Sequence, residues 1–165
     1  MNEIDAIQAS LASFTKRLDE VSSDRFNELR KCSFFDPIPS EWLRPISEQA
    51  EIRTFSPDDC LTAEGDDMNS FYVVLYGTAT VYYNKKIVGT IRSGECIGEG
   101  MYFANENISR SATVVANGQV IAAEFKKAGI ERLQGEEKSY MDKALLLALF
   151  KKLQGANRKI EELLR

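Results

Sequence analysis

An acidic and a basic residue, Glu99 and Arg110, lie eleven positions apart in the segment from Cys96 to Ala116. Each stands at the edge of a short apolar run, and glycines flank the acid on both sides. A carboxylate accepts hydrogen bonds, whereas a guanidinium presents a fixed fork of donors that suits a phosphate. The pair therefore indicates either an ordinary surface ion pair between two strands or the two ends of a site for a small anionic ligand.

The composition limits the chemistry that this chain could perform. With 165 residues it is long enough for one domain with appendages, and it contains no histidine, the commonest general base and metal ligand. Its three cysteines are widely spaced and include no Cys-x-x-Cys pair, so neither zinc nor a disulfide framework is indicated. We therefore predict no metal, no cofactor and no enzymatic activity.

Charge and hydropathy point to the surroundings of the protein. The net charge of −4 argues weakly against nucleic acid, and no charge-free apolar stretch reaches membrane-spanning length. The N-terminus lacks the features of a secretory signal. We expect a cytoplasmic protein that binds neither DNA nor a membrane, with no helix-turn-helix domain before the chain ends at Arg165.

Residues 2–31 have the pattern of an amphipathic helix. Its apolar residues follow steps of 3, 4, 3, 4 and 3 and form what we call the N-terminal stripe: Ile4, Ile7, Leu11, Phe14, Leu18 and Val21. The favoured interpretation is that this stripe packs on its own domain. The reason is that fewer than three heptads are short for a coiled coil. The alternative is a helical partner.

Two prolines, Pro37 and Pro39, end this first helix. Ser40 is predicted to cap a second, short helix from Glu41 to about Ala50, in which Trp42 would anchor the core.

A different periodicity follows between residues 51 and 125. Seven short β-rich runs alternate with turn clusters, which is typical of a sandwich. Asn117-Gly118 between two such runs predicts a hairpin. We predict an eight-stranded antiparallel jelly-roll β-sandwich with N-terminal helices and a long C-terminal helix.

The chain becomes helical again after Phe125, first over residues 126–133 and then from about 136 to 165. The longer helix repeats the steps of 3, 4, 3, 4 and 3 in a C-terminal stripe: Leu146, Leu149, Leu153, Ala156, Ile160 and Leu163. Gly155 could mark a bend or a close crossing. The two stripes could pack on each other, on the sandwich or on a second chain. The expected boundaries are 1–31 for the N-terminal helix, 32–135 for the jelly roll and 136–165 for a helix that acts as a lid, a dimerisation element or both.

Three motifs within this pattern resemble a known family. Glu64-Gly65-Asp66 precedes the strand-like run Phe71 to Gly77, Gly94 to Glu99 reads GECIGE, and Arg110 to Thr113 reads RSAT. In this order the motifs of residues 32–165 are similar to those of cyclic nucleotide-binding domains, the type found in catabolite activator protein and protein kinase A regulatory subunits.

The resemblance implies a phosphate-binding cassette between the acid and the base. Glu99 would accept a hydrogen bond from a ribose 2′-hydroxyl, Arg110 would pair with the cyclic phosphate, and Ser111 would add a hydroxyl to the phosphate or base. The glycines would let the backbone approach closely. The expected ligand-binding residues are Gly98, Glu99, Gly100, Met101, Arg110, Ser111 and Ala112.

This cassette differs from the common form of the family. Glu99 is followed by Gly100-Met101-Tyr102-Phe103, and Met101 falls where a small residue usually stands. The step from Glu99 to Arg110 is also longer than is common. Two functions stay open. One is a cyclic AMP or cyclic GMP sensing module that signals through its C-terminal helix to a partner protein, and the other is a degenerate fold that serves as a protein-interaction or dimerisation module without binding nucleotide. A protein partner or a homodimer would be contacted through residues 1–31 and 136–165. Whether Met101 blocks the pocket separates the two functions.

Overall fold

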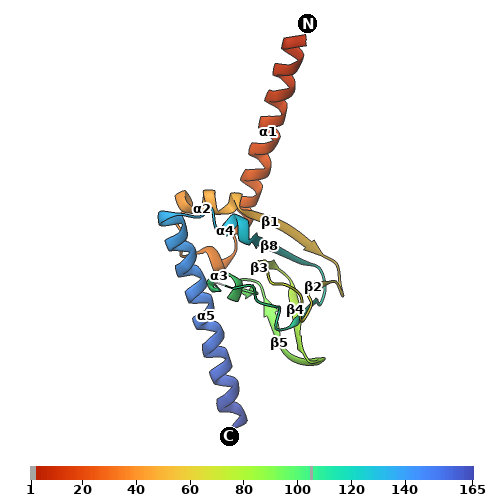
Figure 1. Cartoon of the computed structure of the whole chain (residues 1–165), viewed down its shortest axis with the longest axis vertical. Helices are drawn as coiled ribbons and strands as arrows, with labels where there is room; N and C mark the ends of the chain where they lie inside the picture. Colours follow the sequence, from red (N-terminus) through yellow and green to blue (C-terminus); the bar gives the residue numbers. More distant parts are fainter. Residues whose placement is uncertain (1–2, 105) are drawn as a thin grey trace.

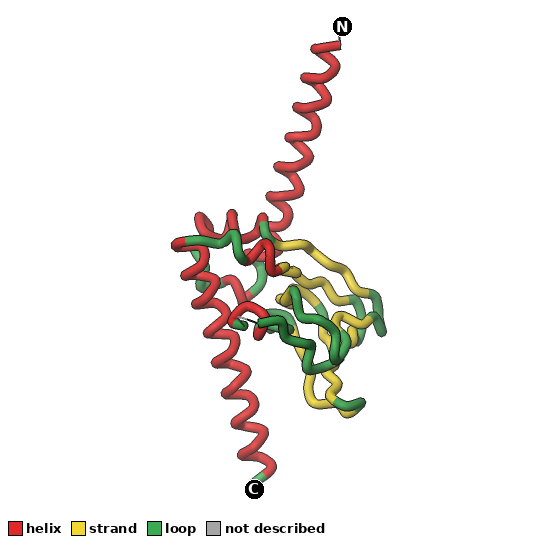
Figure 2. The backbone as a smooth tube through the Cα atoms, in the orientation of Figure 1, coloured by secondary structure: helices red, strands yellow, loops and turns green. Residues whose placement is uncertain are grey.

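The body of the protein is a sandwich of two antiparallel sheets with helices against one of them (Figures 1 and 2). This computed structural model describes residues 3–104 and 106–165, without the side chains of residues 3 and 17–23. The first two positions of the predicted N-terminal helix therefore lie outside the described residues. The described strands are β1 (Ala50–Phe55), β2 (Cys60–Thr62), β3 (Ser70–Tyr76), β4 (Thr78–Tyr83), β5 (Lys86–Arg92), β6 (Cys96–Ile97), β7 (Thr113–Ala116) and β8 (Val120–Lys126).

Each sheet has four strands, in the orders β1-β8-β3-β6 and β2-β7-β4-β5. All of the strand pairs are antiparallel, which confirms the predicted jelly-roll sandwich. Seven of the strands match the β-rich runs of the sequence. The eighth strand, β6, is only two residues long, too short to stand out in the sequence as a β-rich run. It pairs with Tyr72 and Val73 of β3.

The predicted hairpin at Asn117-Gly118 is wrong. The two strands that flank it lie in different sheets: β7 pairs with β2 and β4, and β8 pairs with β1 and β3. Neither residue has the positive φ that a type I′ hairpin turn needs. The Asn117 amide instead donates to Thr78 Oγ1 at 3.2 Å and accepts from Thr80 Oγ1 at 2.6 Å, which fastens the crossover to β4.

The predicted helices are present, with two corrections. Ser40 is the first helical residue of its helix rather than the cap; Pro39 holds the cap position and makes no side-chain cap bond. The helix expected over residues 126–133 is a single turn. The described helices are α1 (Glu3–Arg30), the 3₁₀ turn η1 (Ser33–Phe35), α2 (Ser40–Glu48), α3 (Gly100–Phe103), α4 (Lys127–Ile130) and α5 (Gly135–Leu163).

Both faces of β3 are buried, which explains its nearly continuous apolar sequence. Phe71 and Val73 face the helices, and the Phe71 ring stacks on Phe125 of β8 at 5.1 Å between centroids. Tyr72 and Val74 face the interior of the sandwich. Trp42, expected to anchor the core, is only partly buried; the fully buried apolar side chains of α2 are Leu43 and Ile46.

The N-terminal stripe does not pack on its own domain, and that expectation was wrong. Helix α1 projects from the body, and near its C-terminal end Phe26 and Leu29 join the core (Figure 1). The described side chains of the stripe are 55–64% exposed: Ile4, Ile7, Leu11 and Phe14. The side chains of Leu18 and Val21 lie outside the described residues.

Helix α5 packs on the body with a face other than the C-terminal stripe. Met141, Ala144 and Leu145 are buried, whereas Leu153 of the stripe is 58% exposed and Leu163 is 86% exposed. Nothing lies within 4 Å of where a side chain at Gly155 would begin, so no close crossing occurs there. In the described part of the chain, no helix combines the length and the apolar character that crossing a membrane requires.

Candidate ligand cavity

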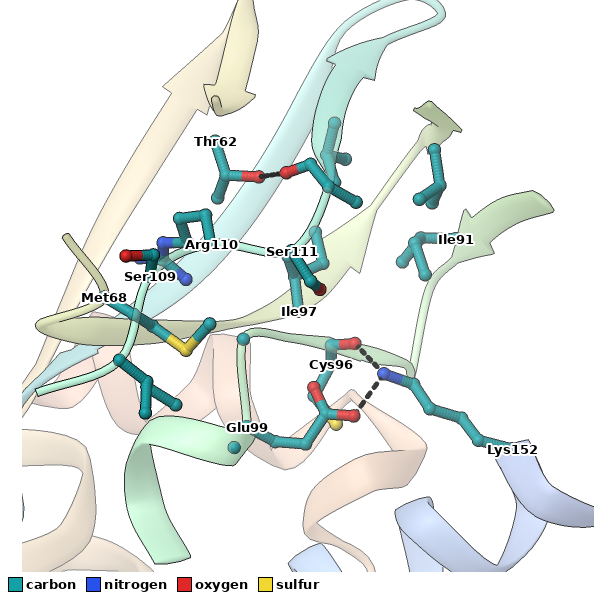
Figure 3. A pocket seen from close by; sticks show the side chains of 16 residues that line it. Thr62, Met68, Ile91, Cys96, Ile97, Glu99, Ser109, Arg110, Ser111 and Lys152 are labelled. Atoms are coloured by element: carbon teal, nitrogen blue, oxygen red, sulfur yellow. Dashed lines mark hydrogen bonds and ion pairs between the residues drawn. The ribbon is translucent and has the colours of Figure 1, made fainter. Parts of the chain in front are cut away.

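A cavity of about 380 Å³ opens between the turn after β6, the segment before β7, and helix α5 (Figure 3). This volume falls within the range of roughly 300–1,000 Å³ that is usual for small-molecule sites. Its apolar wall comes from both sheets and the neighbouring loop: Val81, Ile91, Ile97, Ile108 and Val114. Polar groups are contributed chiefly by Glu99, Arg110 and Lys152.

Glu99 reaches the cavity because β6 ends in a sharp turn. Gly98 has a φ of 76°, a conformation that glycine adopts without strain, and Glu99 then occupies the N-cap position of α3. The Glu99 side chain is 12% exposed, and its Oε1 lies 2.5 Å from Lys152 Nζ. The same ammonium donates to the backbone carbonyl of Cys96 at 2.6 Å. Helix α5 is thereby tied directly to the acid of the cavity.

The backbone of Arg110 is hydrogen-bonded to the loop before β3. Its backbone N–H donates to Asp66 O at 2.7 Å, and its carbonyl accepts from Gly65 N–H at 2.9 Å. The side chain is 8% exposed, and Nη2 donates to Ser70 Oγ at 3.3 Å. Among the described residues, Nη1 has no hydrogen-bond partner. Burial lowers the pKa of Arg110, and the nearby Tyr72 and acidic groups oppose that change.

A small polar cluster lies beneath Arg110 inside the sandwich. The guanidinium carbon is 5.9 Å from the centroid of the Tyr72 ring, and the Tyr72 hydroxyl donates to Glu124 Oε1 at 3.3 Å. Burial, and then the Glu124 carboxylate, raise the pKa of Tyr72. Arg53 approaches the other Glu124 oxygen at 3.7 Å. These contacts fix the direction in which Arg110 points.

Within the described residues, no ion pair joins Glu99 to Arg110. The acid is paired with Lys152 and the base keeps an unpaired N–H, so the arrangement differs from a surface ion pair across a loop. A cavity that offers a fork of donors on one side and a carboxylate on the other suits an anion that also carries a hydroxyl group.

Six of the seven predicted site residues line this cavity: Gly98, Glu99, Gly100, Arg110, Ser111 and Ala112. Met101 is the exception, because its side chain is 6% exposed and belongs to the hydrophobic core beneath α3. Since α3 turns Met101 inward, that side chain does not fill the cavity.

Lys152 and the polar cluster under Arg110 were not among the site residues predicted from the sequence. Lys152 had a detectable signal, because Met141, Leu145, Ala148 and Lys152 follow steps of 4, 3 and 4 along one face of α5. That face holds the buried residues and ends in a cation at the cavity. Ser70, Tyr72 and Glu124 carried no signal of their own, since they lie on strands whose pairing only the fold reveals.

Comparison with known proteins agrees with this geometry. Residues 52–136 match the cyclic nucleotide-binding domain family. The chain is 29% identical over 109 residues to a cGMP-dependent protein kinase of Plasmodium berghei (strain Anka), which covers 64% of this chain and 12% of the relative. It is 32% identical over 90 residues to a cAMP-dependent protein kinase regulatory subunit of Hypocrea atroviridis, which covers 54% of this chain and 19% of that protein. The chain thus spans less than a fifth of either relative.

Among solved structures, the regulatory domain of Toxoplasma gondii PKA with cAMP aligns with a TM-score of 0.61 and 20% identity. The alignment covers 74% of this chain and 48% of that one, and at this identity it supports the fold alone. The family match takes in more than half of the chain and includes the turn at Glu99 and the segment at Arg110. This chain therefore belongs to the cyclic nucleotide-binding domain family.

Proposed function

We propose that this chain is a sensing module that binds cyclic AMP or cyclic GMP in the cavity and signals through α5 to a protein partner. The observation that carries the proposal is the buried Arg110 guanidinium, whose Nη1 has no partner among the described residues. Glu124 and Asp66 act on this guanidinium only from a distance, and among the described residues no acid forms an ion pair with it. A buried charge that is incompletely paired costs stability. A cyclic phosphate in the cavity would supply both the charge and the acceptors.

The remaining residues fit parts of the same ligand. Glu99 would accept from the ribose hydroxyl, Ser111 would donate to the phosphate or base, and Gly98 and Gly100 would allow close approach. Met101 could take part only through its backbone, because its side chain lies in the core. The relatives named above support a cyclic nucleotide as the ligand class.

Lys152 provides the connection to α5. Its ammonium now donates to Glu99 Oε1, on the same carboxylate that the ribose hydroxyl would use. Ligand and Lys152 would compete for this carboxylate, so the nucleotide would favour an arrangement in which α5 is docked differently. A ligand shifts such an equilibrium only by its difference in affinity for the two arrangements.

The alternative is an interaction module that binds no nucleotide. The Glu99–Lys152 ion pair favours it, since this pair satisfies the acid without a ligand.

Thermal unfolding with cyclic AMP, cyclic GMP or a cyclic dinucleotide decides between the two functions. A ligand at 100 times its dissociation constant should add about 2.7 kcal/mol to the free energy of unfolding. No stabilisation by any of them at millimolar concentration would leave only the interaction module.

Arg110→Ala tests the phosphate contact. Calorimetric titration should show a loss of about 1.5–3 kcal/mol in binding free energy, the usual contribution of a hydrogen bond to a charged group. Arg132→Ala is the charge-matched control, because Arg132 is exposed beyond α4 and does not line the cavity. Equal affinity in Arg110→Ala and the control would show that the phosphate lies elsewhere.

A further inference from the structure

The two apolar stripes lie on helices that project from opposite ends of the body (Figures 1 and 2). Most of the described side chains of the two stripes are exposed: Ile4 and Leu11 are 64% and 59% exposed, and Leu153 and Ile160 are 58% and 55% exposed, whereas Leu149 is half-buried. We propose that a second copy of the chain covers both. The N-terminal stripe of each copy packs antiparallel against the C-terminal stripe of the other, in a closed two-fold dimer.

The lengths and directions of the helices allow this arrangement. Helices α1 and α5 have 28 and 29 residues, so each is about 40 Å long at 1.5 Å per residue. The chain runs towards the body in α1 and away from it in α5 (Figure 1). A two-fold axis across the long dimension would place α1 of one copy beside α5 of the other, at both ends of the dimer. The contact is therefore reciprocal and closes, as is common for dimers.

The register of the two stripes matches position by position. Both have six apolar residues at steps of 3, 4, 3, 4 and 3. When they are aligned antiparallel, Ile4 meets Leu163 of the second copy, and every later position finds an apolar counterpart through to Val21 and Leu146. A repeat that averages 3.5 residues keeps such a contact on one face along both helices.

Charge favours this mixed pairing over the pairing of like helices. Before Lys16, the N-terminal segment holds the acids Glu3 and Asp5 and no lysine or arginine. From residue 151 onward, the chain has two acids against five bases: Lys151, Lys152, Arg158, Lys159 and Arg165. Over the whole contact, the antiparallel arrangement sets the part of α1 before Lys16, with a net charge of −2, against the chain from residue 151 onward, with a net charge of +3, although Glu161 and Glu162 lie beside Leu163. Packing α5 against α5 would instead bring two net-positive segments together.

This inference deepens the part of the proposed function that places a partner at α5, but it does not depend on nucleotide binding. Arg110→Ala should weaken nucleotide binding and leave the dimer intact. The two proposals can therefore fail separately.

Light scattering of the full chain measures the first outcome. We expect a mass of twice the 18.6 kDa of one chain, with and without cyclic nucleotide. Leu11→Asp alone and Leu153→Asp alone should each halve the mass, because each contact needs both stripes. Ser13→Asp and Gln154→Asp add the same charge at exposed positions beside the stripes and should leave the dimer intact.

The pattern of variants excludes other assemblies. A monomeric wild-type chain would overturn the proposal. If only Leu11→Asp breaks the dimer, the contact is α1 against α1, and if only Leu153→Asp breaks it, the contact is α5 against α5; either result contradicts the mixed pairing. Far-UV circular dichroism shows that each variant is folded.

Disulfide trapping tests the register. In a Cys60→Ser background, which removes the exposed thiol, one chain carries Ile7→Cys and a second, differently tagged chain carries Ile160→Cys. After co-expression and oxidation, only the mixed dimer should be cross-linked. Ile7→Cys with Leu149→Cys is the control pair for a parallel register and should not cross-link. Cross-linking of either chain with itself, or of the parallel pair alone, would overturn the antiparallel contact.

Discussion

At the scale of single residues, Gly98 decides where the guanidinium of Arg110 can lie. Its φ of 76° is one that side chains rarely adopt, and a Cβ at this position would overlap Arg110 Nη1. The absence of a side chain is therefore what allows Arg110 to pass over the turn after β6. The spacing of Gly98 from Arg110 in the sequence does not show this contact.

Gly98→Ala should consequently weaken nucleotide binding at least as much as Arg110→Ala, roughly tenfold or more for a charge-assisted contact of about 1.5–3 kcal/mol. The reason is displacement of the guanidinium by the new methyl group. Calorimetric titration with the nucleotide that stabilises the wild-type chain gives the affinity.

Gly65→Ala separates this clash from backbone strain. Gly65 has a similar φ of 88°, but nothing lies within 4 Å of the position of its missing Cβ. Both variants should lose stability, and only Gly98→Ala should lose affinity. A parallel loss of affinity in Gly65→Ala would show that backbone strain around Arg110, rather than a clash with its guanidinium, controls binding.

At the scale of elements, helix α5 has one face that packs on the body and another that carries the mostly exposed C-terminal stripe. The first face is buried through Met141, Ala144 and Leu145 and ends at Lys152, which pairs with Glu99. Under the proposed competition for Glu99, we expect a movement of α5 at the cavity to reach the proposed dimer contact along the same helix.

Lys152→Met tests the connection between this helix and the cavity. The change keeps the apolar stem and removes the charge that competes for Glu99, so nucleotide affinity should rise about tenfold, the equivalent of one charge-assisted hydrogen bond. Amide exchange in the second half of α5 should become faster without nucleotide. Lys151→Met, an exposed neighbour, is the control.

Weaker binding in Lys152→Met would contradict competition, because it would mean that Lys152 contacts the nucleotide directly.

Much of this architecture could be predicted from the sequence because it depends on local patterns. Seven strands are recognisable in the sequence as β-rich runs between turn clusters, and the long helices are recognisable by their apolar periodicity. Gly98, Glu99 and Arg110 stand in motifs that resemble a family. These features concern neighbours along the chain.

The errors concern contacts between distant segments. Asn117-Gly118 looks like a hairpin turn, but its flanking strands find partners in different sheets. Helix α5 has two apolar faces, and periodicity alone cannot tell which one the body buries. Met101 appears in the sequence beside the acid of the cavity, yet the single turn of α3 rotates its side chain into the core.

At the scale of the whole molecule, the helices share one hydrophobic core with the sheet β1-β8-β3-β6, and the interior of the sandwich forms a second. Cys32 precedes η1 and Cys96 lies in β6, far apart in the sequence, yet both belong to the same buried cluster as Phe71 and Met141. Cys60 is exposed. The Cys60 thiol therefore reports on the folded state, and the thiols of Cys32 and Cys96 report on opening of the core.

We expect one fast and two slow thiols when the protein is labelled with a thiol reagent at pH 8. Burial raises the pKa of Cys32, and it raises that of Cys96 to about 12, so neither forms thiolate readily in the folded state. Both should label together, at the rate set by global unfolding, because one core encloses them. Cys60→Ser should remove the fast phase alone.

A nucleotide at 100 times its dissociation constant should slow the labelling of the two buried thiols about a hundredfold. Faster labelling of Cys96 than of Cys32 would mean instead that α5 leaves the cavity without unfolding of the rest, and the cooperative unit would then exclude this helix.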